Sequence, residues 1–256
     1  MMVTKKAWIT TAHQGYCEEN MHSNTLSAFF LAAKNGADMI ETDARKTSDG
    51  VLIANHDPDV VGMDENGNEV KYDVKTTDYE TISKVILAKD DPMGIQYVPT
   101  LESILKFAYY SGLMVNIDLK EGILDAENIA KLVAKCGMRG RVVYATNGAG
   151  YKAINKILKI DPAARFIDTP KNFTSKLLKK VRNYPEKCYA YTADFSDENI
   201  NKIRENNVML AAIGLNEKTA PKAFSINPDM MEYPHTSKFF EIEKKLIKES
   251  MKNIIK

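Results

Sequence analysis

Residues 36 to 58, GADMIETDARKTSDGVLIANHDP, have the pattern of two short strands joined by a Ser-Asp-Gly turn. Side chains alternate across a strand, so Glu41 and Asp43 share one face of the first strand. On the second strand, His56 lies on the same face as Ala54. Two carboxylates and an imidazole are therefore expected close together. Oxygen ligands of this kind suit Mg²⁺ or Ca²⁺ better than zinc, although acids at a strand end also form plain ion pairs.

The composition indicates a globular protein that neither binds nucleic acid nor spans a membrane. Of its 256 residues, 44% are hydrophobic and 27% are charged, and the formal net charge is +1. Because no long basic stretch is present, this charge argues against nucleic-acid binding. No apolar run of about 18 residues predicts a membrane span. The three cysteines, Cys17, Cys136 and Cys188, lack metal-type spacing and are expected to be free thiols.

The first expected strand begins at Trp8, and no basic-then-apolar signal region comes before it. We therefore expect a cytoplasmic protein, or a secreted or periplasmic one if a signal sequence has been removed. The sequence leaves the oligomeric state open.

Strand-like and helix-like segments alternate along the chain, which is typical of βα units around a parallel sheet. The eight expected strands cover residues 8–12, two segments within 36–58, then 113–119, 141–146, 164–168, 208–215 and 228–233. Residues 188–193 form a further strand-like piece. Together with the chain length, this pattern predicts an α/β fold, a (β/α)8 TIM barrel that forms a single domain over residues 1–256.

Two segments depart from the simple alternation. Residues 58–98 are expected to form a polar excursion followed by a helix, because the stretch is too long for an ordinary connection. Residues 236–256 are expected to form one amphipathic C-terminal helix that packs against the barrel. In the helix expected over residues 24–36, Leu26, Phe29 and Phe30 recur at helical spacing and predict a side that faces the core.

Polar side chains follow four of the expected strands. They are His13, Glu41, Asp43, His56, Asp118 and Lys120. Working groups of a TIM barrel sit at the carboxyl ends of its strands, so these six should meet at one mouth. The chemistry that fits is metal-assisted hydrolysis, in which carboxylates hold a divalent cation, two imidazoles exchange a proton, and a lysine stabilises negative charge. The sequence contains neither a phosphate-binding glycine loop nor a Gly-x-Ser-x-Gly elbow.

Short motifs run through the first half of the chain in a fixed order. They are His13-Gln14-Gly15, Asn24-Thr25-Leu26, Gly36-Ala37-Asp38, Glu41-Thr42-Asp43, Asp49-Gly50-Val51, His56-Asp57, Pro99-Thr100-Leu101-Glu102 and Asp118-Leu119-Lys120. In this order the chain resembles the glycerophosphodiester phosphodiesterases over about its first 120 residues. Beyond them, Glu232-Tyr233-Pro234 is also similar to the family.

The resemblance implies an enzyme of lipid metabolism with a TIM barrel and a bound Mg²⁺ or Ca²⁺. Its substrate would be a small-molecule glycerophosphodiester, cleaved to glycerol phosphate and an alcohol, with the substrate's own glycerol hydroxyl attacking the phosphorus. Carried over by position, the implied roles are an acid-base pair of His13 and His56, metal ligands Glu41, Asp43 and Asp118, and substrate contacts Lys120 and Gln14.

Four positions and one segment depart from the family pattern. Gln14 stands where the family usually has Arg, Ser23 where it has Glu, Gly62 where it has Arg, and Asp118 where it has Glu. The segment 209–214 lacks the aromatic residue that the family usually offers to the substrate. Because the histidines and acids are kept while phosphate contacts are lost, we expect a changed or narrower substrate range rather than an inactive protein.

Two alternatives stay open. The same fold can act on a lysophospholipid or a sugar phosphodiester, or the chain can be a non-catalytic barrel that binds a phosphodiester. The sequence does not identify the alcohol part of the substrate or the metal.

Overall fold

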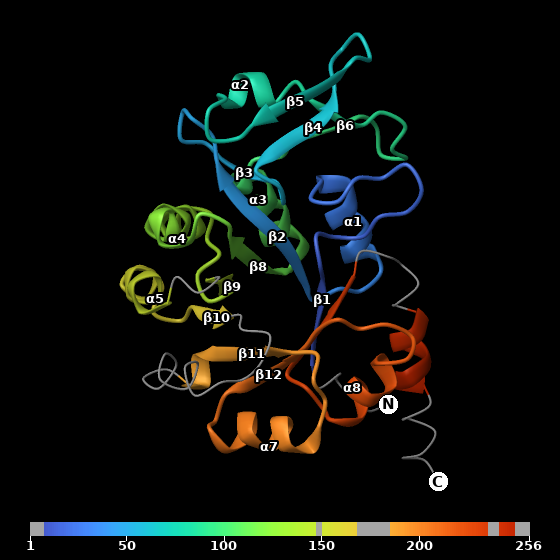
Figure 1. The fold of residues 1–256 in the computed structure, drawn as a ribbon, viewed down its shortest axis with the longest axis vertical. Coiled ribbons are helices and arrows are strands. Elements are labelled where there is room, and N and C mark those ends of the chain that lie inside the picture. Colours follow the sequence, from blue (N-terminus) through green and yellow to red (C-terminus); the bar gives the residue numbers. More distant parts are fainter. Residues whose placement is uncertain (1–7, 147–149, 168–184, 235–240, 249–256) are drawn as a thin grey trace.

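The computed structural model describes residues 8–146, 150–167, 185–234 and 241–248. Within them, eight parallel strands close into a barrel (Figure 1). The ring follows chain order, and its last strand pairs with the first. The barrel strands are β1 (Ile9–Ala12), β2 (Met39–Lys46), β8 (Met114–Leu119), β9 (Val142–Ala145), β10 (Arg165–Ile167), β11 (Cys188–Thr192), β12 (Met209–Ala212) and β13 (Met230–Tyr233). The predicted (β/α)8 TIM barrel is confirmed.

Helices surround the barrel (Figure 1). They are α1 (Leu26–Lys34), α3 (Leu101–Ser111), α4 (Ala126–Lys135), α5 (Gly150–Leu158), α7 (Asp197–Glu205) and α8 (Ala220–Ser225), with short 3₁₀ turns η1 (Gly122–Leu124) and η2 (Pro185–Lys187). Side-chain caps fix where several of them begin. The Thr25 hydroxyl accepts the Ala28 N–H, and Ser196 accepts the Asn199 N–H at the start of α7.

The assignment of the third barrel strand is a correction to the sequence analysis. The second strand of the opening stretch, β3 (Leu52–Ala54), pairs antiparallel with the end of β2 and lies outside the ring. The place that this leaves in the ring, the sixth in chain order, belongs to β11, which lies within the strand-like piece at residues 188–193. Alternation of side chains predicts a strand, but it carries no information on the strand's direction or on its partner.

The insertion (residues 58–98) lies beyond the carboxyl end of β2 (Figure 1). Within this excursion from the barrel, the chain forms a second, antiparallel sheet in the order β5-β4-β6-β7, which the sequence analysis did not predict. Its elements are β4 (Asp59–Met63), β5 (Glu69–Asp73), α2 (Tyr79–Ile82), β6 (Ile86–Ala88) and β7 (Gln96–Tyr97). Val60, Val74 and Val85 are buried in a small core that also contains Ile53 of β3. Because the other face of this sheet is exposed, as in β5, its side chains include many polar ones, and the sequence analysis did not recognise the strands.

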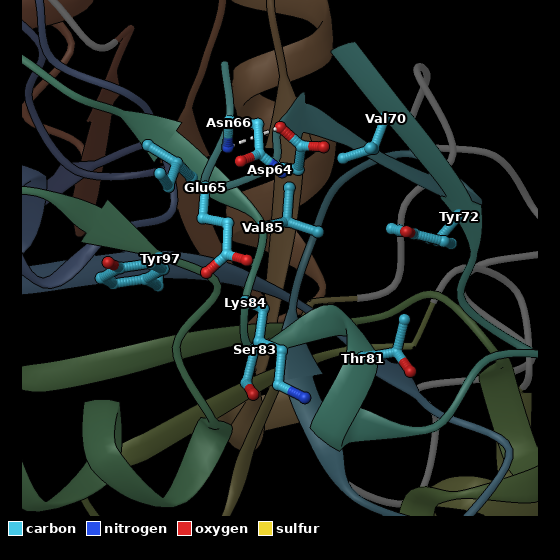
Figure 2. Close-up of a pocket in the computed structure, with 11 residues that line it drawn as sticks. Asp64, Glu65, Asn66, Val70, Tyr72, Thr81, Ser83, Lys84, Val85 and Tyr97 are labelled. Carbon is cyan, nitrogen blue, oxygen red and sulfur yellow. Dashed lines mark hydrogen bonds between the residues drawn. The ribbon is translucent and has the colours of Figure 1, made fainter. Parts of the chain in front are cut away.

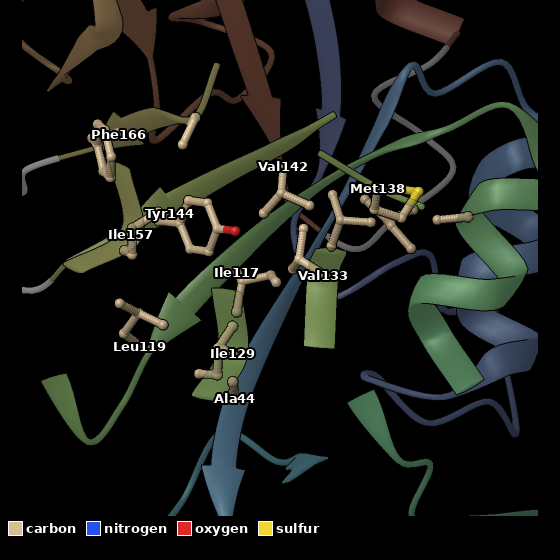
Figure 3. Close-up of a cluster of buried hydrophobic side chains, with 14 of the residues drawn as sticks. Ala44, Ile117, Leu119, Ile129, Val133, Met138, Val142, Tyr144, Ile157 and Phe166 are labelled. Carbon is tan, nitrogen blue, oxygen red and sulfur yellow. The ribbon is translucent and has the colours of Figure 1, made fainter. Parts of the chain in front are cut away.

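Alternation along the strands separates two apolar layers. Inside the barrel, residues such as Met39, Val143 and Met230 pack together. On the outside, a larger cluster fills the space between the strands and the helices (Figure 3). The interior positions nearest the carboxyl ends of β2, β8 and β13 are polar instead, and these form the site described below.

The C-terminal segment packs on the barrel. Residues 241–248 are helical, and Glu243 is buried against β1, where its carboxylate accepts hydrogen bonds from Trp8 Nε1 and the Thr10 hydroxyl. The remainder of the expected helix over 236–256 lies outside the described residues. No helix in the described ranges combines the length and apolar character needed to cross a bilayer. The three cysteines are free, as expected.

Candidate active site

Three carboxylates meet at the carboxyl end of β2 and β8. Glu41 and Asp43 alternate on β2, and Asp43 lies in register with Asp118 on β8. We call these residues the acid trio. Each of the three residues offers one oxygen, and the three oxygens lie within 4.8 Å of one another. The structure thus brings together the three side chains that the sequence analysis grouped as metal ligands.

The donor set of the acid trio fits a hard divalent cation. Oxygens on opposite sides of a bound ion are separated by about 4.2 Å for Mg²⁺ and about 4.6–5.2 Å for Ca²⁺, which is twice the metal-oxygen distance. The observed upper limit of 4.8 Å lies within the range for Ca²⁺ and above the value for Mg²⁺. Carboxylate oxygens without nitrogen or sulfur partners are the ligands that both of these ions prefer.

The acid trio carries more negative charge than its surroundings neutralise. Burial, followed by the charges of Asp43, Glu232 and Asp118, raises the pKa of Glu41 well above its usual value. Lys120 Nζ lies 2.8 Å from Asp43 Oδ1 and 2.7 Å from Asp118 Oδ2. Burial opposes the charge on Lys120, but these two carboxylates outweigh it and raise the pKa of the amine. One lysine beside several acids leaves room for a further cation.

Gln14 and Asn24 hold two members of the acid trio, Glu41 and Asp43, in place. The Gln14 backbone N–H donates to Glu41 Oε2 at 2.9 Å, and its side-chain Nε2 donates to Asp43 Oδ2 at 2.8 Å. Asn24 Nδ2 donates to the same oxygen at 2.8 Å. The φ angle of Gln14 is 55°, in the left-handed region that side chains other than glycine rarely adopt. This backbone conformation aims both donors of Gln14 at the acids.

The two histidines lie in one cleft of about 430 Å³, which we call the histidine cleft. His13 follows β1, and its Nε2 is 3.8 Å from Glu41 Oε2. His56 follows β3, and its Nδ1 is 2.8 Å from Asp57 Oδ1, a contact that lowers the pKa of Asp57. The cleft is lined by His13, Gln14, His22, Ser23, Asn24, Ala54, Asn55, His56, Asp57, Asp59, Val61 and Leu87.

The position of His56 differs from the sequence expectation. We expected it at the end of a barrel strand, but it lies past β3, on the connection to the insertion. Arg45 fixes this connection, because its Nη2 and Nε donate to the His56 carbonyl at 2.7 and 3.2 Å. Asn55 adds two bonds from Nδ2 to the carbonyls of Asp57 and Asp59. The histidine is therefore held by its backbone, while its ring stays exposed.

A larger cavity of about 640 Å³ lies on the insertion, and its lining residues all fall between 64 and 97 (Figure 2). It contains neither a histidine nor a member of the acid trio. Asp64, at its rim, uses one carboxylate oxygen to accept the backbone N–H groups of Asn66 and Asn68, as an ordinary turn residue does. Size alone would favour this cavity, but the titratable residues that the sequence analysis grouped lie in the smaller histidine cleft and the acid trio.

A fourth acid, Glu232 on β13, lies inside the barrel near the acid trio. The Tyr191 hydroxyl donates to Glu232 Oε2, and Asn116 Nδ2 donates to the Tyr191 hydroxyl at 3.2 Å. Burial, only partly offset by the Tyr191 hydrogen bond and reinforced by the charge of Asp118, raises the pKa of Glu232 to about 7. The sequence analysis noted Glu232 only as part of a family motif.

Sequence reasoning missed several residues that support the site. Asn24 was interpreted only as the start of a helix, although its motif position beside Thr25 was noted. Arg45 shares the β2 face of the acids, and this alternation could have suggested it. Tyr191 gave no signal, because a tyrosine in an apolar strand is usually part of the core.

Comparison with known proteins supports the reading of these motifs. Residues 13–154 match the model of the glycerophosphoryl diester phosphodiesterase family. The uncharacterized protein YqiK of Bacillus subtilis (strain 168) is 27% identical over 214 residues, which cover 72% of this chain and 85% of YqiK. A glycerophosphodiester phosphodiesterase of Caldanaerobacter subterraneus subsp. tengcongensis is 28% identical over 142 residues, 54% of this chain and 57% of that protein. The chain thus spans little more than half the length of this second relative.

The fold also has solved counterparts. A phosphodiesterase of Oleispira antarctica, solved in complex with the product sn-glycerol-3-phosphate, superposes with a TM-score of 0.73 at 16% identity. The match covers 94% of this chain and 96% of that one. At this identity the likeness bears on the fold alone. Because the family match spans more than half of the sequence and contains both histidines and the acid trio, the chain belongs to the glycerophosphoryl diester phosphodiesterase family.

Proposed function

We propose that the protein hydrolyses glycerophosphodiesters to glycerol phosphate and an alcohol, with a divalent cation, Mg²⁺ or Ca²⁺, on Glu41, Asp43 and Asp118. The observation that carries the proposal is the arrangement of the acid trio within 4.8 Å, beside a cleft that contains both His13 and His56. When bound, the cation would polarise a phosphoryl oxygen and neutralise developing negative charge.

The residues of the chain then have separate roles. One imidazole of the histidine cleft accepts a proton from the attacking glycerol hydroxyl, and the other donates a proton to the departing alcohol oxygen, which leaves a cyclic phosphate. Water then opens this ring to give glycerol phosphate. His13 is the better candidate for the base, because its Nε2 faces the Glu41 carboxylate at 3.8 Å. Lys120 supplies fixed positive charge beside the phosphoryl group. Both donors of Gln14 are used by two acids. Lys120 is then the single cationic contact to the phosphate, which is fewer than in the family pattern.

Release of glycerol phosphate from a panel of glycerophosphodiesters, with Mg²⁺ or Ca²⁺, tests the proposal. His56→Ala should lower kcat by about 10²- to 10⁴-fold, the usual contribution of a positioned acid or base, and leave cation binding unchanged. Asp43→Asn should abolish cation binding measured by calorimetry. Glu127→Gln, on the exposed side of α4, is the control and should change neither. If no substrate is cleaved and His56→Ala binds phosphodiesters like the wild type, the protein is a binding barrel.

An apolar groove favours one second candidate, a lysophospholipid substrate. The groove, of about 640 Å³, lies between α1, α3 and β7. Leu26 and Phe30, which the sequence analysis placed toward the core, are 38% and 44% exposed there, and Met93 and Ile95 face it from the insertion. The groove lies next in sequence to residues that line the histidine cleft, and a hydrophobic pocket in this place would suit an acyl chain.

The two substrate classes can be separated by a ratio. If lysophospholipid is the substrate, Phe30→Ser should reduce turnover of lysolipid about tenfold relative to a soluble glycerophosphodiester. Tyr110→Ser, an aromatic residue on α3 that is 85% exposed, is a matched control. An unchanged ratio would leave the soluble diester as the substrate.

A further inference from the structure

Tyr191 reaches across the interior of the barrel. It lies on β11, and in register it is paired with Ala211 on β12. The small side chain of Ala211 leaves space for the ring. The Tyr191 hydroxyl contacts Glu232, two strands away in the ring, and Asn116, three strands away in the other direction. A hydroxyl that contacts side chains on both of these strands must lie near the barrel axis. The Tyr191 hydroxyl and its neighbours therefore form the bottom of the barrel mouth, which we call the floor.

Polar atoms around this hydroxyl lack partners. Asn116 Oδ1 and Thr11 Oγ1 are buried, and among the described residues they have no hydrogen-bond partner. Thr11 lies in register with Glu232, and Asn116 lies in register with Glu41. A buried oxygen left without a hydrogen bond costs free energy unless a ligand or water supplies one. The floor therefore presents unsatisfied acceptors close to the acid trio.

The charge of this floor restricts the ligand. Glu232 adds a carboxylate to the three acids of the trio, and the lysine beside the trio, Lys120, is already paired with Asp43 and Asp118. A phosphate group would be repelled here. A neutral hydroxyl suits the site, because it can donate to Asn116 Oδ1 or to Glu232 and accept from the Thr11 hydroxyl.

We propose that Tyr191, Glu232 and Asn116 form a subsite for one free hydroxyl of the substrate's glycerol, which makes Tyr191 a specificity-determining residue. The inference rests on the proposed function and extends it to the part of the substrate that the acid trio and the histidines do not explain. A site built to pair a buried hydroxyl rejects analogues that lack it, since its own polar groups then remain unpaired. The terminal hydroxyl is the relevant one, because the neighbouring hydroxyl is the nucleophile.

Two substrates separate these hydroxyls. Glycerophosphoethanolamine carries both, and the 2-hydroxyethyl ester of phosphoethanolamine keeps the attacking hydroxyl and lacks the terminal one. Both release ethanolamine, so one assay measures both. The wild type should prefer the glycerol ester in kcat/KM. Tyr191→Phe keeps the ring and removes the hydroxyl, and it should reduce kcat/KM for the glycerol ester about 10- to 100-fold. Activity on the 2-hydroxyethyl ester should stay within about twofold.

Matched variants control for general damage to the barrel. Tyr189→Phe changes a tyrosine two residues deeper on the same face, whose hydroxyl accepts a bond from Arg165 Nη1 at 3.2 Å, and it should leave the preference intact. Glu232→Gln should reduce the preference as Tyr191→Phe does. Cation binding, measured by calorimetry, should be equal in all four proteins.

Two results would overturn the subsite. Equal losses on both esters would give Tyr191 a purely structural role, and unchanged kinetics on both would mean that water alone fills the floor. Failure of the proposed function looks different, because the wild type itself would release ethanolamine from neither ester, and the subsite would then fall with it.

Discussion

At the scale of single residues, Gln14 shows how a departure from the family pattern is used. The sequence analysis expected it to contact substrate in place of an arginine. In the structure both of its donors point to acids, the backbone N–H to Glu41 and the side chain to Asp43. The residue therefore orients the carboxylates. A positive φ of 55° is the conformational cost of this arrangement.

Replacement of Gln14 should weaken cation binding. Gln14→Ala removes the side-chain donor to Asp43 and should reduce the affinity for Mg²⁺ or Ca²⁺ by about 10- to 100-fold, as the loss of groups that orient metal ligands usually does. Calorimetric titration measures the effect. Gln96→Ala, which removes an amide on β7, should bind the cation like the wild type. Equal affinity of Gln14→Ala and the wild type would contradict an orienting role.

Glu232 predicts how stability depends on pH in the metal-free protein. Its pKa is raised to about 7 from 4.5, so between these values the folded state keeps a proton that the unfolded state loses. The contribution of Glu232 to the free energy of unfolding is therefore greatest below pH 4.5, and it falls as the pH rises to about 7. The decrease should be on the order of 2–3 kcal/mol.

Urea unfolding of chelator-treated protein between pH 5 and pH 8 measures this decrease. Glu232→Gln, which cannot ionise, should flatten the dependence over that range. The raised pKa of Glu41 acts in the same direction, so some slope should remain in the variant. A wild-type protein whose stability rises across the range would contradict the assignment.

At the scale of elements, the insertion depends on a close crossing of two strands. A Cβ atom on Gly62 would lie 2.5 Å from the Ile86 carbonyl oxygen and 2.6 Å from Val85 Cγ1. Only glycine lets β4 approach β6 so closely. The arginine that the family usually has at this position would therefore have no room for its side chain.

Gly62→Ala should destabilise the insertion by about 1–3 kcal/mol, the usual cost of overpacking. Limited proteolysis within residues 58–98 and denaturant unfolding measure the loss. Val61→Ala changes the adjacent side chain, which is 48% exposed, and should stay within about 0.5 kcal/mol of the wild type. Equal stability of the two variants would mean that the strands can separate at small cost.

The elements also show what the sequence could and could not predict. Barrel strands such as β2 and β8 were recognised as short runs of buried residues, and alternation identified the acids that share a face on β2. The prediction that β3 is a parallel strand of the barrel was wrong, because a short apolar run fits a parallel or an antiparallel partner equally well. The contact between Tyr191 and Glu232 depends on barrel closure, which joins side chains 41 positions apart.

At the scale of the whole molecule, cation binding should stabilise the barrel. Glu41 and Asp43 come from β2 and Asp118 comes from β8, so an ion on the acid trio links two neighbouring strands. A ligand at 100 times its Kd stabilises the folded state by about 2.7 kcal/mol, which corresponds to a rise in Tm of about 5–10 °C for a chain of this length. Thermal melts with and without MgCl₂ or CaCl₂ test this, and Asp118→Asn should lose the shift.

The sequence analysis predicted that residues 1–256 form a single domain, and this stays a prediction.

The two histidines of the cleft belong to parts of the chain with different freedom to change. His13 follows a strand of the closed ring, where a shift in length would break the pairing of its neighbours. His56 follows β3, on the way out to the insertion, where residues can be added or deleted without reopening the ring. Lineages descended from such a protein can therefore acquire new preferences by remodelling residues 57–98 alone. We expect relatives with different substrates to diverge most in that segment.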